Sequence, residues 1–261
     1  MRKRWLIGWI GLLILPALAR GQIVVSELSQ EWVVTPGQIY QGGIEVQNLS
    51  EEPAAVEIYQ SDYCFYADGR SEYPPPGKLP RSNAGWIILE VASPRITIPP
   101  KSSVTVPYTI RVPEDPNLVG TYWSVVNVRF SSPGPPMEGL VIRHVFEYGV
   151  QIVTDIGDTG RRDIRVIGSK LIEREDGLSF QLDLENTGER WLSPIVWLEV
   201  YDKEGNFVGR FESGRLRIYP GTSVRHRIPL PILEPGSYPA LLIIDNLDEY
   251  VWGAQVTLEV R

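Results

Sequence analysis

The sequence is poor in the residues that most often form cross-links or bind metals. It has a single cysteine, Cys64, so no disulfide can form within the chain. We expect Cys64 to be a small apolar residue at the end of a strand, with an intermolecular bridge or a reactive thiol as the alternatives. Its only histidines, His144 and His226, are too few for a zinc site at these spacings.

Local signatures of catalysis are also missing. No nucleophile elbow surrounds any serine, although a Ser-His-Asp arrangement stays open from residue order alone. Two-carboxylate glycosidase chemistry stays open as well, because acidic residues are plentiful. The spaced acids of 154–160 lack the other ligands of a calcium loop and indicate a solvated turn. We therefore expect a protein that is not an enzyme and has no cofactor.

Long apolar runs are absent beyond the N-terminus. There, three cations at 2–4 precede an apolar run of 11 residues, Trp5–Leu15, and 17–19 read Ala-Leu-Ala. This is the pattern of a secretory signal peptide cleaved after Ala19, with cleavage after Gly21 or retention as an anchor as alternatives. No cysteine lies directly after the run, where a lipoprotein anchor requires one, so such an anchor is excluded. We expect an exported chain, periplasmic or at the cell surface, with no stable membrane span after cleavage.

Basic residues are outnumbered by acidic ones. The formal net charge is −7, and removal of the signal peptide with its three cations makes it about −10. This balance argues against nucleic acid and against anionic lipid as partners.

Short β-strands punctuated by proline and glycine are what the sequence has in abundance. In Ser102–Arg111, apolar residues alternate with Thr, Pro and Arg, which is typical of a half-buried strand. A shorter version of the same pattern recurs from Leu216 to Asp245, including a strand at Leu216–Ile218. The pattern predicts an all-β fold of two tandem immunoglobulin-like β-sandwich domains after an N-terminal signal peptide.

The expected domains follow from this repeat. They are a signal peptide at 1–19, an N-terminal sandwich at 20–155, a linker at 156–163 and a C-terminal sandwich at 164–261. Asn48 and Pro100 are 52 residues apart, whereas the matching Asn186 and Pro220 are 34 apart. The 18 extra residues of the first domain indicate an insertion at 64–85.

The insertion is rich in aromatic residues and proline. Phe65, Tyr66 and Tyr73 could stack on sugar rings, which gives an alternative function as a cell-wall carbohydrate- or peptidoglycan-binding module. The competing interpretation is a flap packed on its own sandwich.

A long strand is predicted at Leu140–Val153. Its backbone could pair with a partner strand while Leu140, Ile142 and Phe146 fill the partner's groove. The competing interpretation is that this strand is already paired on both sides.

The linker carries two adjacent cations, Arg161 and Arg162. In an acidic protein they are a candidate docking point for an acidic group of a partner, in a cleft between the domains. They could instead pair with Asp155, Asp158 or Asp163.

Two family resemblances rest on the tandem domains and on short motifs. The motifs are Trp-Ile at 86–87, Ile-Pro-Pro at 98–100, Gly-Thr-Tyr-Trp at 120–123 and Val-Trp-Gly-Ala at 251–254. These motifs make the chain similar to the WxL-interacting cell-surface proteins. The two exported immunoglobulin-like domains in tandem, without a catalytic signature, resemble the PapD-like periplasmic chaperones of pilus assembly. The resemblance implies a non-enzymatic assembly chaperone or surface scaffold that binds another exported protein by strand addition. Pilus chaperones hold a subunit's C-terminal carboxylate with an Arg and a Lys; no such pair is matched here, and Arg143 is the candidate.

Overall fold

The computed structural model describes residues 23–133, 143–174 and 177–260, and these residues form an all-β protein. The predicted fold class of two tandem immunoglobulin-like sandwiches is confirmed, with one short 3-10 helix, η1 (Ala84–Trp86). The predicted signal peptide lies outside the described residues. Among those residues, none belongs to a helix with the length and apolar character needed to cross a membrane.

The first sandwich packs a four-stranded sheet against a five-stranded one. The smaller sheet has the order β1 (Ile23–Val25), β3 (Ile39–Asn48), β9 (Ser102–Arg111) and β7 (Ile87–Leu89). The larger sheet has the order β2 (Ser29–Val34), β11 (Arg143–Ile156), β10 (Gly120–Pro133), β4 (Ala54–Ser61) and β8 (Arg95–Ile98). Strand β2 runs parallel to β11, and every other pair is antiparallel. A small hairpin, β5 (Cys64–Phe65) and β6 (Ser71–Glu72), follows β4.

The second sandwich packs a three-stranded sheet against a four-stranded one. The smaller sheet has the order β12 (Ile164–Arg174), β13 (Gly177–Asn186) and β16 (Ser223–Leu230). The larger sheet has the order β15 (Phe207–Ser213), β14 (Ile195–Tyr201), β17 (Gly236–Asp245) and β18 (Val251–Val260). The strand predicted at Leu216–Ile218 is wrong: Ile218 forms only an isolated bridge with Leu192, and its carbonyl also accepts a side-chain hydrogen bond from Asn186.

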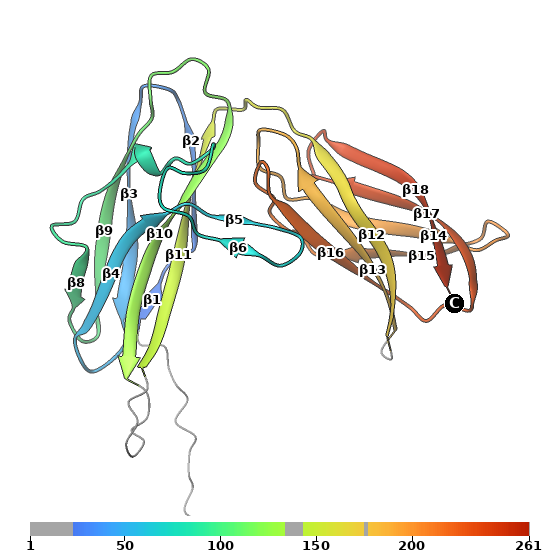
Figure 1. Ribbon diagram of the computed structural model, residues 1–261, viewed down its shortest axis with the longest axis horizontal. Coiled ribbons are helices and arrows are strands. Elements are labelled where there is room, and N and C mark those ends of the chain that lie inside the picture. The colour runs from blue at the N-terminus through green and yellow to red at the C-terminus, as the bar shows by residue number, and fades with distance from the viewer. Residues whose placement is uncertain (1–22, 134–142, 175–176, 261) are drawn as a thin grey trace, which may run out of the picture.

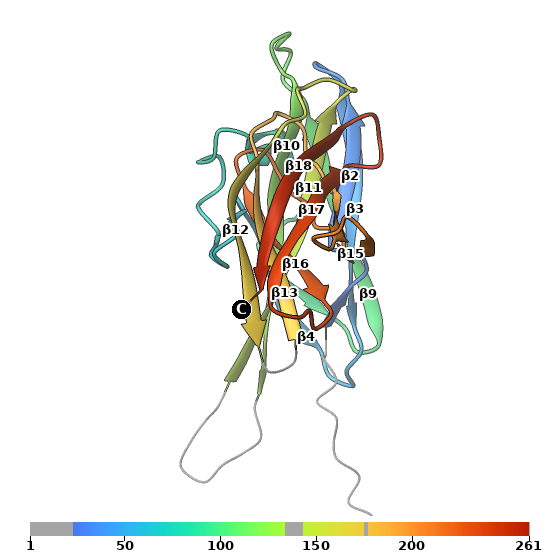
Figure 2. The same cartoon turned by 90° about the vertical axis from the view of Figure 1, so that its right-hand side faces the viewer.

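The two sandwiches stand side by side, joined at one end by the short connection between β11 and β12 (Figure 1). The β5–β6 hairpin projects from the first sandwich toward the sheet of β12, β13 and β16. Turned by 90°, the molecule shows β17 and β18 in front, on the far side of the second sandwich from the hairpin (Figure 2).

Each sandwich has its own apolar core, built from alternating strand positions. In β9 the predicted inward face is confirmed, since Val106, Tyr108 and Ile110 are buried in the first core. In the second core, Leu182 and Leu198 come from β13 and β14 and lie on facing sheets. Each such side chain contributes about 1.5–3 kcal/mol relative to an exposed position, so burial holds the sheets together.

A buried asparagine closes the same corner in both sandwiches. The Asn48 amide donates to the carbonyls of Ile98 (3.0 Å) and Glu52 (2.7 Å), and its Oδ1 accepts from the Ser50 backbone N–H (3.0 Å). The Asn186 amide bonds to carbonyls and to the backbone N–H of the second residue onward in the same manner. The two corners therefore confirm the predicted match of Asn48 to Asn186. Because its amide hydrogens are used and enclosed, Asn48 is a structural residue of this turn.

Replacing either corner asparagine should destabilise the protein strongly. We expect Asn48→Ala and Asn186→Ala each to lower the free energy of unfolding by about 2–4 kcal/mol, because each change leaves buried carbonyls without donors. Urea denaturation measures this. Asn117→Ala is the control, since the Asn117 side chain bonds only to Asp115 on the surface, and a loss below about 0.5 kcal/mol is expected there. Equal effects of all three changes would contradict the account.

Candidate functional site

The candidate site is the part of β11 that has a neighbour on one side only. Strand β10 pairs with β11 along its whole length, from Gly120–Ile156 to Pro133–Arg143. Strand β2 covers the other side only from Gln151 to Ile156. Among the described residues, no strand pairs with the other side of residues 144–150. The strand is thus paired on both sides in one half and open in the other.

The backbone groups along this open half point in a known direction. The Gln151 N–H donates to the Leu28 carbonyl beside β2 (2.9 Å), so it faces away from β10. Successive N–H groups of a strand alternate in direction, and the pairing with β10 has no bulge. The N–H groups of Val145, Glu147 and Gly149 therefore face the open side. Residues 144–150 are called the free edge below.

Apolar side chains accompany the free edge. Val145 is 65% exposed and Phe146 is 44% exposed, which is unusual for such residues in the middle of a sheet. The Phe146 ring stacks on Phe130 of β10 with centroids 5.2 Å apart. Farther along, the Tyr148 hydroxyl donates to the Ile23 carbonyl of β1 (3.1 Å). Successive side chains of a strand point to opposite faces, so Phe146 lies on the core-facing side with Tyr148 and Val150, and Val145 lies on the outer side with Glu147. The free edge thus combines unpaired backbone with one exposed apolar side chain on each face of the sheet, and these two side chains are called the apolar ledge below.

A polar cluster lies beside the ledge on the outer face of the same sheet. The Tyr59 hydroxyl donates to Glu147 (2.6 Å), and Arg129 forms an ion pair with the same carboxylate (2.9 Å). Partial burial and the hydrogen bond to Glu147 raise the pKa of Tyr59 to about 12. The phenol therefore remains a donor at every physiological pH, and the cluster holds Glu147 in place.

The structure describes only some of the residues that are predicted to fill the partner's groove. Leu140 and Ile142 lie outside the described residues, and Arg143 begins β11 without a described side chain. Phe146 lies on the ledge. The assignment of these residues to partner binding stays a prediction.

The upper end of β11 belongs to a tight joint between the sandwiches. Trp123 of β10 stacks on Tyr219, with ring centroids 4.5 Å apart and an interplanar angle of 9°. Burial raises the pKa of Tyr219 to about 12. Its hydroxyl donates to the Gln151 side chain, just where the free edge begins. Val153 of β11 packs against the same pair and is fully buried.

Polar contacts fix the joint on its other side. The Trp191 indole N–H donates to Asp155 (3.0 Å), and its backbone N–H donates to the Thr121 hydroxyl (3.0 Å). Arg190 donates to the Gly157 carbonyl (2.8 Å). At Gly120, φ is +71° and an added Cβ would lie 2.0 Å from the Glu189 carbonyl oxygen, so only glycine allows this approach. The 120–123 motif is thus explained by packing between the sandwiches.

The predicted insertion is fixed at its base and contacts the second sandwich at its tip. The buried Asp62 carboxylate accepts backbone N–H groups of residues 77–79 and the Ser82 hydroxyl, which fixes the base of the loop. At its tip, the Ala67 N–H donates to the Ser223 hydroxyl (2.9 Å), and Phe65 packs edge-on against Tyr219. No sequence motif marks Asp62 for this role.

Two of the three aromatic residues predicted as a ligand loop, Phe65 and Tyr73, both pack against Tyr63, with ring centroids 5.3 Å and 5.0 Å from its ring, whereas Tyr66 has other contacts. Phe65 is part of the joint, and Tyr66 lies beside the buried Cys64 thiol (3.6 Å) and under Arg70. Tyr73 is 58% exposed and stacks on Tyr63. Their role in ligand binding stays a prediction.

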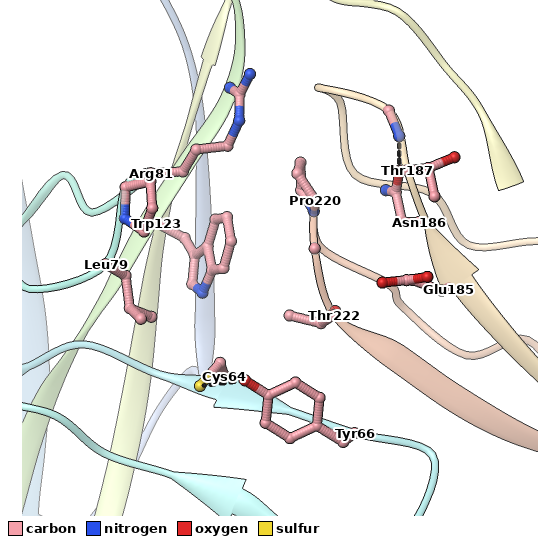
Figure 3. Close-up of a pocket in the computed structure, with 13 residues that line it drawn as sticks. Cys64, Tyr66, Leu79, Arg81, Trp123, Glu185, Asn186, Thr187, Pro220 and Thr222 are labelled. Carbon is pink, nitrogen blue, oxygen red and sulfur yellow. Dashed lines mark hydrogen bonds between the residues drawn. The ribbon is translucent and has the colours of Figure 1, made fainter. Parts of the chain in front are cut away.

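A pocket of about 550 Å³ opens beside the joint (Figure 3). Trp123 and Arg81 line it from the first sandwich, and Pro220 faces them from the second, with Cys64 and Tyr66 below. The Arg81 guanidinium is occupied, because it donates to the carbonyls of Val119 and Thr121. The pocket is a feature of the joint.

The two linker arginines are paired in the free protein. Arg161 bonds to Asp163 and to the Thr187 carbonyl, and Arg162 bonds to Asp158 and lies over the Tyr250 ring. Asp155 pairs with Arg190 instead. Docking of a partner at Arg161 and Arg162 stays a prediction, and it would require exchange of these ion pairs.

The two histidines have different surroundings. His144 lies on the exposed free edge. His226 is buried in the second sandwich, where its Nδ1 bonds to the Ser213 hydroxyl (2.7 Å) and its Nε2 has no partner among the described residues. Burial lowers the pKa of His226 to about 4. This serine–histidine pair is enclosed, so no substrate can reach it. Within the described ranges, no three metal-binding side chains gather.

Comparison with known proteins found similar solved structures but no related sequence. No protein-family model and no curated protein matches the sequence. Among solved structures, the chain is similar to the class 5 fimbriae chaperone CfaA at 13% identity, over 92% of this chain and 99% of that one, with a TM-score of 0.45. The YadV chaperone is 12% identical, over 91% of this chain and 100% of that one, with a TM-score of 0.45. The E. coli chaperone DraB is 11% identical, over 91% of this chain and 98% of that one, with a TM-score of 0.40. The similarity to pilus chaperones predicted from the sequence is thus found across most of the chain. At this identity the likeness concerns the fold alone.

Removing the joint should free the sandwiches from each other. We expect the Tyr219→Ala, Trp191→Ala double variant to keep both cores but to lose the stacking and the bond to Asp155. ¹⁵N relaxation should then give two shorter tumbling times where the unaltered protein gives one. Tyr201→Ala is the control, because Tyr201 packs on Phe207 away from the joint. Two tumbling times in the unaltered protein would contradict a fixed joint.

His226 should make stability depend on pH. The unfolded-state pKa is about 6.5 and the folded-state pKa about 4, so the unfolded chain binds the proton first as pH falls. The stabilisation is complete above pH 6.5 and declines by up to ~3 kcal/mol between pH 6.5 and 4. In urea titrations over this range, His226→Asn should flatten the slope, since Asn can keep the bond to Ser213. The control His144→Asn should not. Parallel slopes for all three proteins would refute the assignment.

Proposed function

We propose that this protein is an exported, non-enzymatic assembly chaperone or surface scaffold that binds another exported protein by β-strand addition at the free edge. The observation that carries the proposal is the half-paired state of β11. Three backbone N–H groups, those of Val145, Glu147 and Gly149, face outward next to a ledge formed by Val145 and Phe146. Main-chain hydrogen bonds supply affinity in strand addition, and apolar side chains supply specificity.

The charges along the free edge support its use in strand addition. Proteins normally blunt an open edge with charge, proline or a covering loop, because it invites pairing with another chain. Glu147 is the one acidic residue of the free edge, and its carboxylate is held by Tyr59 and Arg129 on the sheet face. The edge therefore lacks a free charge that would repel a partner strand.

A carbohydrate-binding function has less support. A sugar platform needs aromatic rings that lie together and face solvent. Phe65 packs in the joint and Tyr66 lies against Cys64, so Tyr73 is the one strongly exposed ring of the three. We therefore give strand addition precedence.

A photo-crosslinker can identify the partner first. Benzoylphenylalanine at position 145 in the exporting cell should cross-link one exported protein, and the same group at Val251 should not. Val251 is 56% exposed on β18 of the second sandwich, which makes it a matched control. Identical products from both positions would indicate unspecific capture.

The purified partner then tests the pairing itself. Val145→Pro removes the N–H that faces the open side and leaves the bonds to β10 intact, whereas Val145→Ala keeps it. We expect the proline variant to bind about 10-fold or more weakly, the equivalent of one lost hydrogen bond and a steric block. The alanine variant should stay within about 3-fold. Equal affinities of the two variants in calorimetry would place binding elsewhere.

A further inference from the structure

The last strand of the second sandwich has a neighbour on one side only. Strand β18 ends the sheet of β15, β14, β17 and β18, and it pairs with β17 over its whole length without a register shift, from Asp245–Val251 to Gly236–Val260. Among the described residues, no strand pairs with its other side (Figure 2). All 10 residues of β18 therefore lie along an open edge of the sheet.

The turn before β18 shows which of its backbone groups face outward. The Asn246 N–H donates to the Tyr250 carbonyl (3.1 Å), so the backbone of Tyr250 faces the chain of β17. This direction alternates along a strand, so the odd-numbered residues of β18 turn their N–H and C=O groups toward the open side. Pro239 of β17 agrees with this assignment, because it stands opposite Thr257 and has no N–H to donate. The outward-facing residues are called the β18 edge below; they are Val251, Gly253, Gln255, Thr257 and Glu259.

The other edge strands of the second sandwich carry features that discourage pairing, and β18 does not. Strand β12 has a register shift at 166–168, β16 contains Pro229, and β15 is 7 residues long and carries Arg210. Bulges, proline, charge and short length are the usual means by which a sheet edge is protected. Within Val251–Val260 there is no proline, and the one charged residue, Glu259, accepts a hydrogen bond from Ser237 (2.9 Å). The β18 edge is therefore suited to accept another strand.

Apolar side chains lie beside this edge on both faces of the sheet. Val251 is 56% exposed on the outer face. Trp252, Ala254 and Val256 stand opposite residues of β17 that are buried in the core, so they share the core-facing side. Ala254 is nevertheless exposed, and Trp252 and Val256 are only half-buried. A strand added at the β18 edge would cover this row and remove apolar surface from water.

We propose that the β18 edge is the interface between two copies of this chain, which pair antiparallel about a two-fold axis at Gln255. Outward-facing residues then meet outward-facing residues along the whole strand, as an antiparallel ladder requires. A single strand sequence fits itself in this register, because the large Trp252 stands opposite Leu258 and the small Ala254 opposite Val256.

The charges of β18 also fit a second copy. In this register Glu259 stands opposite Val251, so no charge meets a like charge across the interface. Both edges are used up in such a two-fold pair, which ends assembly at a dimer. The interface lies in the second sandwich and leaves the free edge of β11 open, so it does not rest on the proposed function. A photo-crosslinker at Val251 would join two copies of this chain and not the exported partner, which keeps that position a control for position 145.

Sedimentation velocity at protein concentrations of about 1 to 100 μM tests the dimer. We expect a monomer–dimer equilibrium in the unaltered protein. Gln255→Pro removes the central outward N–H and leaves the bonds to β17 intact, so the dimer should be about 10-fold or more weaker. Gln255→Ala keeps this N–H and should stay within about 3-fold of the unaltered protein.

A charge exchange at the axis tests the register. Gln255→Lys and Gln255→Glu each place two like charges opposite each other in the dimer, and each should weaken it by up to about 5-fold at about 20 mM salt. An equimolar mixture of the two variants places opposite charges across the axis and should restore the dimer. This rescue also shows that both variants are folded.

Amide hydrogen exchange locates the interface. At high concentration the amides of Gly253, Gln255 and Thr257 should become protected, and on dilution they should exchange fast, while Ala254 stays protected by β17 at both concentrations. A protein that stays monomeric over the whole range overturns the proposal, and so does a mixture of the charge variants that fails to dimerise. A dimer in which the amide of Val145 becomes protected and that of Gln255 does not would place self-association at the free edge and refute the β18 edge.

Discussion

The N-terminal segment of the first sandwich pairs with both sheets, but the same residues cannot pair with both. Strand β1 is bound to β3 in one sheet, with Ile23 buried in the core, and three residues later β2 joins β11 in the other sheet. Because the segment enters the second sheet only at Ser29, it covers β11 from Gln151 upward and leaves the rest open. The Tyr148 hydroxyl closes the gap to β1 with one side-chain bond, so the sandwich stays shut there without a backbone ladder. The free edge is therefore a consequence of how the core is closed.

The joint determines what lies opposite that edge. Trp123 and Tyr219 hold the upper end of β10 against the second sandwich, and Asp155 and Trp191 hold β11 there. The β5–β6 hairpin adds a third point of contact at Ser223. Together these contacts hold the sheet of β12, β13 and β16 at a fixed position beside β11.

The alternation of apolar and polar residues allowed the strands and the repeat to be predicted from the sequence. The strand Ser102–Arg111 has the predicted bounds because its buried side is a clean apolar stripe from Val104 to Ile110. The unequal spacing of the asparagine corners predicts the insertion at 64–85, and the β5–β6 hairpin lies within this range. The sequence could not show that the lower half of β11 is open, because β2 and β11 are more than a hundred residues apart and pair in parallel.

Amide hydrogen exchange on the free protein, residue by residue along β11, measures the half-paired state directly. The account predicts that Val145, Glu147 and Gly149 exchange at least about 100-fold faster than Gln151, Val153 and Asp155, which face β2. Phe146 and Tyr148, whose N–H groups face β10, should be as protected as the latter. An alternation of fast and slow amides that stops at Gln151 is the expected result. Uniform protection from residue 144 to residue 156 would show that the edge is covered and would contradict the account.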